Sequence, residues 1–301
     1  MNVLTVCLSP TFQKTLVFNS FREDEVNRSS EYMLSVAGKG INVSRTLLRL
    51  GTGTEHLTHL GGPRVEEFLS YCSSYGIPVL YAKTESPVRT CVTVINKEKG
   101  TSTELVEESR PVEEGTEERL LALYSKEIGR FDAVTVSGNK AAGYSARLYP
   151  ELVRIAKEKG KLMVLDARGA DLLSSVPYGP DIIKPNLSEF ASTFLGLKGL
   201  AEGDANESLR GSVEETARKL YQDYGIRTVI SRGRFDTWCY DGKAFESIPV
   251  PKAEAPVVNT TGCGDTLTGA MTHALLQGMG LSDAVAFGMR EATERAARTE
   301  L

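Results

Sequence analysis

The stretch ARLYPELVRIAKEKGKLMVLDA, residues 146–167, joins the two kinds of element that decide this fold. Its first part repeats apolar residues with helical periodicity and stops at Gly160, a common helix end. The second part, KLMVLDA, is a continuous apolar run, which is typical of a strand covered on both faces. The stretch therefore predicts a helix followed by a buried strand of a parallel sheet.

The same alternation continues on either side of this stretch. Other helical patterns lie at residues 117–128 and 213–225. Other apolar runs predict buried strands at residues 2–8, 131–138, 181–186 and 226–233. Strands that alternate with helices indicate a doubly wound α/β sheet.

Two segments break this alternation. The first, at about 11–36, contains KTLVFNSF and SSEYMLSV, and the second, at about 87–106, contains two β-type runs around a Lys-Gly turn. The second segment predicts a hairpin. Both could form a small sheet that stands off the main body, and we treat residues 1–301 as one domain.

Composition argues against several classes of function. The chain has 301 residues and a formal net charge of −4, so general affinity for nucleic acid is not expected. Five scattered cysteines without CxxC spacing, and three histidines without an HExxH pattern, indicate neither a disulfide framework nor a zinc site. No apolar run reaches the roughly 18–20 residues of a membrane span, and the first apolar run is too short for a signal peptide. We therefore expect no membrane association and a cytoplasmic protein.

The stretch NTTGCGDTLTGAM, residues 259–271, predicts an anion site where a helix begins. The first N–H groups of a helix are unpaired and carry partial positive charge, and glycines let a ligand approach them closely. Asn259–Thr261 can supply a cap. Gly262, Cys263 and Gly264 therefore indicate an anion hole for a phosphate group.

Asp265 follows this hole in the first turn of the expected helix. A carboxylate beside phosphate is unfavourable for binding, because like charges repel. It is useful if it accepts the proton of a hydroxyl that attacks phosphorus. The alternative is a tight turn from strand to helix in which Asp265 only lies near the helix dipole.

The stretch AGKGINVSRTLLRLG, residues 37–51, is a second glycine-rich turn before a helix. Gly38 precedes Lys39, whose charge can contact a second anion or a sugar hydroxyl, and Asn42 falls in the first turn. A solvated lysine is the alternative. The sequence matches neither the GxxxxGK[ST] phosphate loop nor a GxGxxG dinucleotide pattern after the first strand.

The stretch KPNLSEF, residues 184–190, places an amide and a carboxylate three residues apart. If a helix starts here, Asn186 and Glu189 share one face and could hold a hydrated Mg²⁺. The same spacing is that of an N-cap asparagine with a glutamate at the third helical position, and on this motif alone we prefer the cap.

Taken together, these motifs resemble the PfkB-type carbohydrate kinases of the ribokinase superfamily, and most of all the 1-phosphofructokinase and tagatose-6-phosphate kinase branch. The motifs VNR (26–28), AGKGINVSR (37–45), KPNLSE (184–189) and VNTTGCGDTLTGA (258–270) occur in the family's order. The resemblance implies a three-layer, ribokinase-like α/β fold with a small β-sheet lid. It also implies ATP and Mg²⁺ as cofactors and a sugar phosphate as the small-molecule substrate.

The resemblance also implies roles for individual residues. Asp265 would be the catalytic base, beside an anion hole of Gly262, Cys263 and Gly264. Glu189 would hold Mg²⁺ through water. The nucleotide would be bound by Asn186, Ser231, Gly233 and Thr260. The acceptor would be bound by Gln13, Arg28, Gly38, Lys39, Asn42 and Arg89.

The acceptor end departs from the family pattern. Ser9, Gln13 and Cys91 stand where the family usually has asparagine, aspartate and asparagine, and Ala37 replaces a glycine. We expect phosphorylation of a ketohexose phosphate of the fructose 1-phosphate or tagatose 6-phosphate type. The alternatives are a kinase for an unphosphorylated sugar or nucleoside, and a regulator that binds nucleotide or sugar without catalysis. By analogy of fold, the lid could support a homodimer.

Overall fold

A nine-stranded sheet forms the centre of the computed structural model, which describes residues 1–29, 31–200, 206–253, 255 and 260–297. The strand order is β13-β12-β11-β10-β9-β8-β1-β4-β5, and every pair from β11 to β5 is parallel. The strands are β1 (Asn2–Val6), β4 (Gly53–Gly61), β5 (Val79–Thr84), β8 (Ala133–Ser137), β9 (Leu162–Asp166), β10 (Ile182–Ile183), β11 (Arg227–Arg232), β12 (Phe235–Tyr240) and β13 (Phe245–Ile248). The predicted doubly wound α/β sheet is confirmed.

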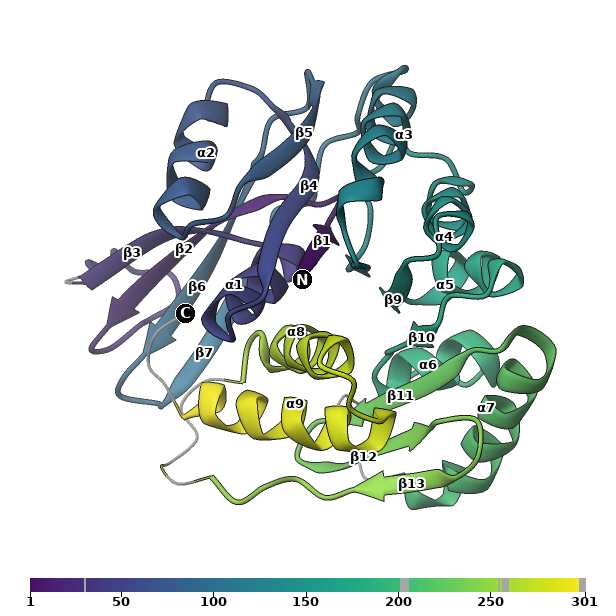
Figure 1. The fold of residues 1–301 in the computed structure, drawn as a ribbon. Helices are drawn as coiled ribbons and strands as arrows, with labels where there is room; N and C mark the ends of the chain where they lie inside the picture. The colour runs from purple at the N-terminus through teal and green to yellow at the C-terminus, as the bar shows by residue number, and fades with distance from the viewer. Residues whose placement is uncertain (30, 201–205, 254, 256–259, 298–301) are drawn as a thin grey trace.

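Helices cover both faces of this sheet (Figure 1). Helices α1, α8 and α9 lie on one face, whereas α3 to α7 lie on the other. The helices are α1 (Lys39–Arg49), α2 (Val65–Ser74), α3 (Thr116–Glu127), α4 (Leu148–Glu158), α5 (Gly169–Ser175), α6 (Leu187–Phe194), α7 (Arg210–Tyr224), α8 (Cys263–Leu276) and α9 (Leu281–Ala296). Short 3₁₀ turns lie at Ile128–Arg130, Val176–Tyr178 and Glu207–Leu209.

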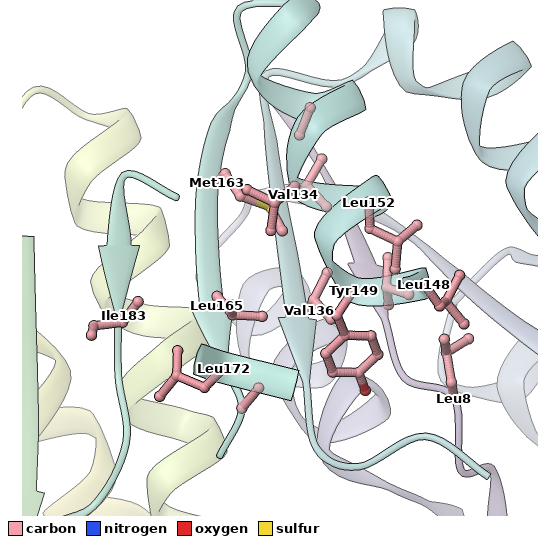
Figure 2. Packing of buried hydrophobic residues seen from close by; sticks show 14 of the residues in the cluster. Leu8, Val134, Val136, Leu148, Tyr149, Leu152, Met163, Leu165, Leu172 and Ile183 are labelled. Carbon is pink, nitrogen blue, oxygen red and sulfur yellow. The ribbon is translucent and has the colours of Figure 1, made fainter. Parts of the chain in front are cut away.

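The stretch at residues 146–167 forms α4 and β9, as predicted, and both contribute to the main core. Figure 2 shows apolar side chains of α4 against those of β8 and β9. Each large apolar side chain buried in this way stabilises the fold by about 1.5–3 kcal/mol. The labelled residues are Leu8, Val134, Val136, Leu148, Tyr149, Leu152, Met163, Leu165, Leu172 and Ile183.

A separate four-stranded sheet has the order β3-β2-β6-β7. Its strands are β2 (Thr11–Phe18), β3 (Glu31–Ala37), β6 (Arg89–Asn96) and β7 (Thr101–Leu105), and β6 and β7 form the predicted hairpin. Phe12 joins the small sheet to the main body, because its buried ring packs edge-on against Phe68 of α2 at 5.7 Å between centroids. The opposite face of β2 carries Thr11 and Gln13.

Several elements differ from the sequence prediction. The strand expected at residues 181–186 is limited to Ile182–Ile183, because Pro185 follows and cannot donate to the sheet. The strands β4, β5, β12 and β13 were not predicted. Strand β4 contains His56 and His59, so the run reads as polar, although both side chains are buried and the strand lies between β1 and β5. No helix in the described part of the chain is long and apolar enough to cross a membrane.

Candidate active site

Helix α8 begins at a glycine turn. Gly262 is its N-cap residue, with φ of 80°, a left-handed conformation that favours glycine. The N–H of Cys263 donates to the carbonyl of Thr260 at 3.2 Å. The next two N–H groups, those of Gly264 and Asp265, have no partner among the described residues. They are therefore the backbone donors left for an anion.

Part of the cap expected from the residues before this turn lies outside the described residues. The N-cap residue Gly262 has no side chain that could act as a cap, Asn259 lies outside the described residues, and Thr260 takes part through its carbonyl group. The N–H of Cys263 is also used within the turn. The sequence identified the right turn, but the set of its free donors depends on turn geometry, which composition does not determine.

The carboxylate of Asp265 lies in the first turn of α8 and is only 6% exposed. Burial raises its pKa to about 6, although Lys39, Asn42 and Lys184 act in the opposite direction. Asn42 of α1 donates from Nδ2 to Oδ2 of Asp265 at 2.8 Å. No ion pair joins Asp265 to a basic side chain in the described part of the chain. A buried carboxyl group with this pKa can exchange a proton near neutral pH.

A buried carboxylate between two lysines lies close to Asp265. Asp166, at the carboxyl end of β9, is 3.2 Å from Lys184 Nζ through Oδ2 and 3.4 Å from Lys39 Nζ through Oδ1. Thr268 of α8 donates to the same carboxylate at 3.4 Å. Burial acts to raise the pKa of Asp166, but the two lysines outweigh it and hold the pKa below its usual value.

Sequence reasoning missed Asp166 and Lys184 as site residues. Both follow buried strands, and the carboxyl ends of parallel strands are where ligands bind in open α/β sheets. Lys184 is 3% exposed, and its Nζ lies 3.9 Å from where a Cβ on Gly264 would be. The sequence signal that could have identified both residues is a charged residue at the end of an apolar run.

Lys39 is placed differently from the simple expectation of a cation facing an anion or a sugar. Its ammonium group pairs with Asp166, which raises the pKa of Lys39 above its usual value. Its aliphatic chain lies over Gly138, 3.5 Å from where a Cβ would be. Gly138 has φ of 91°, and its carbonyl accepts a hydrogen bond from Tyr149 at 2.8 Å. Gly38, the N-cap of α1 with φ of 115°, immediately precedes Lys39.

The motif KPNLSEF forms a capping box at the start of α6. The Asn186 side chain accepts from the N–H of Glu189 at 2.8 Å, and Glu189 Oε2 accepts from the N–H of Asn186 at 3.0 Å. The other oxygen, Oε1, is 4.0 Å from Arg168. The preferred capping interpretation therefore describes the contacts observed. It leaves one carboxylate oxygen of Glu189 for a water-mediated cation contact.

The other residues expected at the nucleotide lie at the end of β11, in the turn that follows it and in the turn before α8. Ser231 forms an isolated parallel bridge with Asn186, so the motif and the end of β11 lie side by side. Gly233 has φ of 60° and turns the chain from β11 into β12. Thr260 is exposed at the turn before α8. The structure thus joins Ser231 to Asn186 directly and places Thr260 at the candidate anion hole.

The residues expected at the acceptor end are only partly brought together. Gln13 donates to Thr93 at 2.8 Å, and Arg89 donates from Nη1 to the carbonyl of Glu107 at 2.8 Å. Because β2 and β6 are in register from Thr11 and Arg89 onward, Gln13 and Arg89 lie on the same face of the small sheet. Arg28 is exposed, and its side chain forms no hydrogen bond or ion pair with another described residue.

One further arginine that the sequence did not single out lies beside the glycine turn. Arg295 of α9 donates from Nη2 to the carbonyl of Thr261 at 3.1 Å. The same atom is 3.5 Å from where a Cβ on Gly262 would be. It therefore adds positive charge next to the N-terminus of α8.

The cysteines do not form a metal or redox centre in the described part of the chain. All five are free, and no group of three or more His, Cys, Asp and Glu side chains is arranged to hold a metal there. Burial raises the pKa of the Cys263 thiol, although Arg295 acts against this. A thiol with a raised pKa is a poor nucleophile.

Comparison with known proteins identifies relatives over most of the chain. The sequence profile of the pfkB family carbohydrate kinases matches residues 12–299. Phosphofructokinase-2 from Escherichia coli, in complex with fructose-6-phosphate, has a similar fold, with a TM-score of 0.84 and 20% identity over 98% of this chain and 93% of that one. A protein described as a possible 1-phosphofructokinase, from Thermotoga maritima, has a TM-score of 0.86 and 22% identity over 100% of this chain and 93% of that one.

Proposed function

The chain belongs to the pfkB family of carbohydrate kinases, which use ATP, and we propose that its acceptor is a ketohexose phosphate. The observation that carries the proposal is Asp265, a buried carboxyl group with a pKa of about 6 beside two backbone N–H groups that have no partner among the described residues. A base in this setting is matched to a hydroxyl acceptor near neutral pH. The neighbouring donors suit the anionic group that the hydroxyl attacks.

In the proposed reaction, the acceptor hydroxyl gives its proton to Asp265 while its oxygen forms a bond to the γ-phosphorus of ATP. The bond from that phosphorus to the oxygen bridging to the β-phosphate breaks, and ADP leaves. The N–H groups of Gly264 and Asp265 would hydrogen-bond the transferring phosphoryl oxygens, together with the turn formed by Gly262 and Cys263. Lys184 would add positive charge there, because its ammonium group lies beside Gly264.

The nucleotide end would use the loops that meet at α6. We propose that Asn186, Ser231, Gly233 and Thr260 contact the nucleotide. Glu189 fits a role in holding Mg²⁺ through water, because its Oε1 is not used by the capping box. Mg²⁺, when bound, would neutralise charge on the phosphates of ATP.

The acceptor end would lie against the small sheet, which would act as a lid. Gln13 and Arg89 share one face of it, and arginine can bind a phosphate with two parallel hydrogen bonds. We propose that Arg28, Gly38 and Lys39 complete this end. Tyr32 and Leu105 of the same sheet are 74% and 54% exposed, which supports the expectation that the lid also joins two copies of the chain.

A coupled assay of ADP formation across sugars and sugar phosphates tests the proposal. We expect turnover with a ketohexose phosphate and loss of turnover in Asp265→Asn, with ATP binding retained. Arg28→Ala and Arg89→Ala should raise the KM for the phosphorylated acceptor by 10-fold or more, roughly the effect of losing a charged hydrogen bond.

Other outcomes of the same assay would contradict the proposal. A preference for an unphosphorylated sugar or nucleoside, with KM unchanged in both arginine variants, would favour that alternative acceptor class. Absence of turnover with every acceptor, with nucleotide binding intact, would favour a regulator. Retained turnover in Asp265→Asn would exclude Asp265 as the base.

A further inference from the structure

Asn42 makes the one side-chain hydrogen bond to Asp265 found among the described residues. Its Nδ2 donates to Oδ2 at 2.8 Å, whereas no described group hydrogen-bonds Oδ1. Asn42 lies on α1 and Asp265 on α8, 223 residues apart in the sequence. A contact between two helices therefore gives Oδ2 of this carboxylate a hydrogen-bond donor, whereas Oδ1 has none among the described residues.

The packing of α1 on α8 fixes this contact. One helical turn further along each helix, Thr46 meets Gly269, where an added Cβ would lie 3.0 Å from both Thr46 Cβ and the Val43 carbonyl oxygen. Thr46 follows Asn42 by four residues on α1, and Gly269 follows Asp265 by four residues on α8. The contacts Asn42–Asp265 and Thr46–Gly269 therefore lie one helical turn apart along the same two helix faces. The close approach at Gly269 sets the distance over which Asn42 reaches the carboxylate.

We propose that Asn42 is a positioning residue, which holds Oδ2 of Asp265 so that Oδ1 is the atom that accepts the proton of the acceptor hydroxyl. The inference rests on the proposed kinase function and deepens it. A carboxylate held by one oxygen cannot rotate freely, and orientation of reacting groups is a large part of catalysis. The family resemblance implied that Asn42 binds the acceptor, which is a different role with a different kinetic consequence.

The same hydrogen bond has an electrostatic effect. An amide N–H that donates to a carboxylate stabilises the charged form, and Asn42 accordingly lowers the pKa of Asp265 against the effect of burial. Without this donor, the effect of burial raises the pKa of Asp265 further. The base would then hold its proton to higher pH, which a pH–rate profile records.

The test compares Asn42→Ala and Asn42→Leu with the wild-type chain, using the best acceptor from the ADP assay. The leucine variant keeps most of the volume of the side chain and has no donor. Arg45→Ala is the matched control, since Arg45 lies on the same helix but stacks on Tyr75 at 4.7 Å. In both Asn42 variants we expect kcat to fall about 10- to 100-fold. The pH midpoint of kcat should rise by roughly one unit. KM should stay within about twofold, and Arg45→Ala should change none of these.

Three results would overturn the inference. One is a rise in KM with an unchanged pH midpoint, which identifies Asn42 as an acceptor contact. Another is an unchanged profile in an active, folded variant. If the variants fail to fold, a crystal structure of the wild-type chain with ADP and the sugar phosphate decides: Nδ2 must remain on Oδ2, and its transfer to the sugar contradicts the inference. An inactive wild-type chain would instead overturn the proposed function itself.

Discussion

Replacement of Asp265 by asparagine should abolish turnover and at the same time make the folded protein more stable. The pKa of this carboxyl is raised from 3.8 to about 6 by burial, a difference of roughly two units. Each unit corresponds to about 1.4 kcal/mol, so the ionised group destabilises the fold by about 3 kcal/mol at pH 7.5. An amide of the same shape removes that charge and can still bond to Asn42.

The gain in stability from Asp265→Asn should increase as the pH rises. As pH rises from about 4 to 6, Asp265 loses its proton in the unfolded chain before it does so in the folded one. The folded state binds more protons in this window, so rising pH lowers its relative stability. The advantage of Asp265→Asn should therefore be near zero at pH 4, grow between pH 4 and 6, and be complete above pH 6.

The measurement is thermal or denaturant unfolding of both proteins without ligands, at pH 4 and at pH 7.5. For a chain of this length, about 3 kcal/mol corresponds to roughly 5 °C in Tm. Asp166→Asn is the matched control with the opposite sign. It leaves Lys39 and Lys184 without their carboxylate and should destabilise the fold by about 3–5 kcal/mol. Equal stability of wild type and Asp265→Asn at pH 7.5, or a gain that persists at pH 4, would refute the reasoning.

Three further predictions concern the same turn and base. The wild-type kcat/KM should rise about tenfold per pH unit below pH 6 and level off above it, because Asp265 must be ionised; a flat profile from pH 5 to 8 would contradict this. Gly262→Ala should cost about 1–2 kcal/mol in denaturant unfolding and lower kcat, since alanine resists a φ of 80°, whereas Gly211→Ala, in open space in α7, should be neutral or stabilising. Cys263→Ala should keep kcat within about twofold, because this position contributes its backbone; a large loss would give the thiol a role.

Local patterns were enough to predict the parallel strands β1, β8, β9, β10 and β11 of the large sheet, but not the parallel strands β4 and β5. Strand β8 is buried at every position, and its run of apolar residues is visible in the sequence without any tertiary information. Strand β4 was missed because Thr54, His56, Thr58 and His59 are buried in it. His56 is accommodated by a hydrogen bond to Thr5 at 2.9 Å, and burial lowers its pKa to about 3, so it is neutral. A partner 51 residues away cannot be read from local periodicity.

The candidate site also contains some residues that local sequence patterns predict and others that they do not. The turn before α8 and the position of Asp265 within its first turn follow from short-range rules for glycine and for helix termini. Asp166 and Lys184 meet because β9 and β10 pair in register, and Lys39 joins them from α1. Such a cluster depends on the order of strands in the sheet. A single sequence shows only that each residue is charged.

The charges of this cluster also bear on how the reaction would proceed. With both carboxylates ionised, Asp166 and Asp265 balance Lys39 and Lys184, and the cluster is neutral. When Asp265 takes up a proton, the cluster gains one positive charge beside the N-terminus of α8, where Arg295 and the helix dipole are already positive. A bound phosphoryl group favours that protonated state, because opposite charges attract. Proton uptake by Asp265 and binding of the phosphoryl group should therefore stabilise each other, so the pH midpoint of kcat, which reports the complex, should lie above that of kcat/KM, which reports the free enzyme.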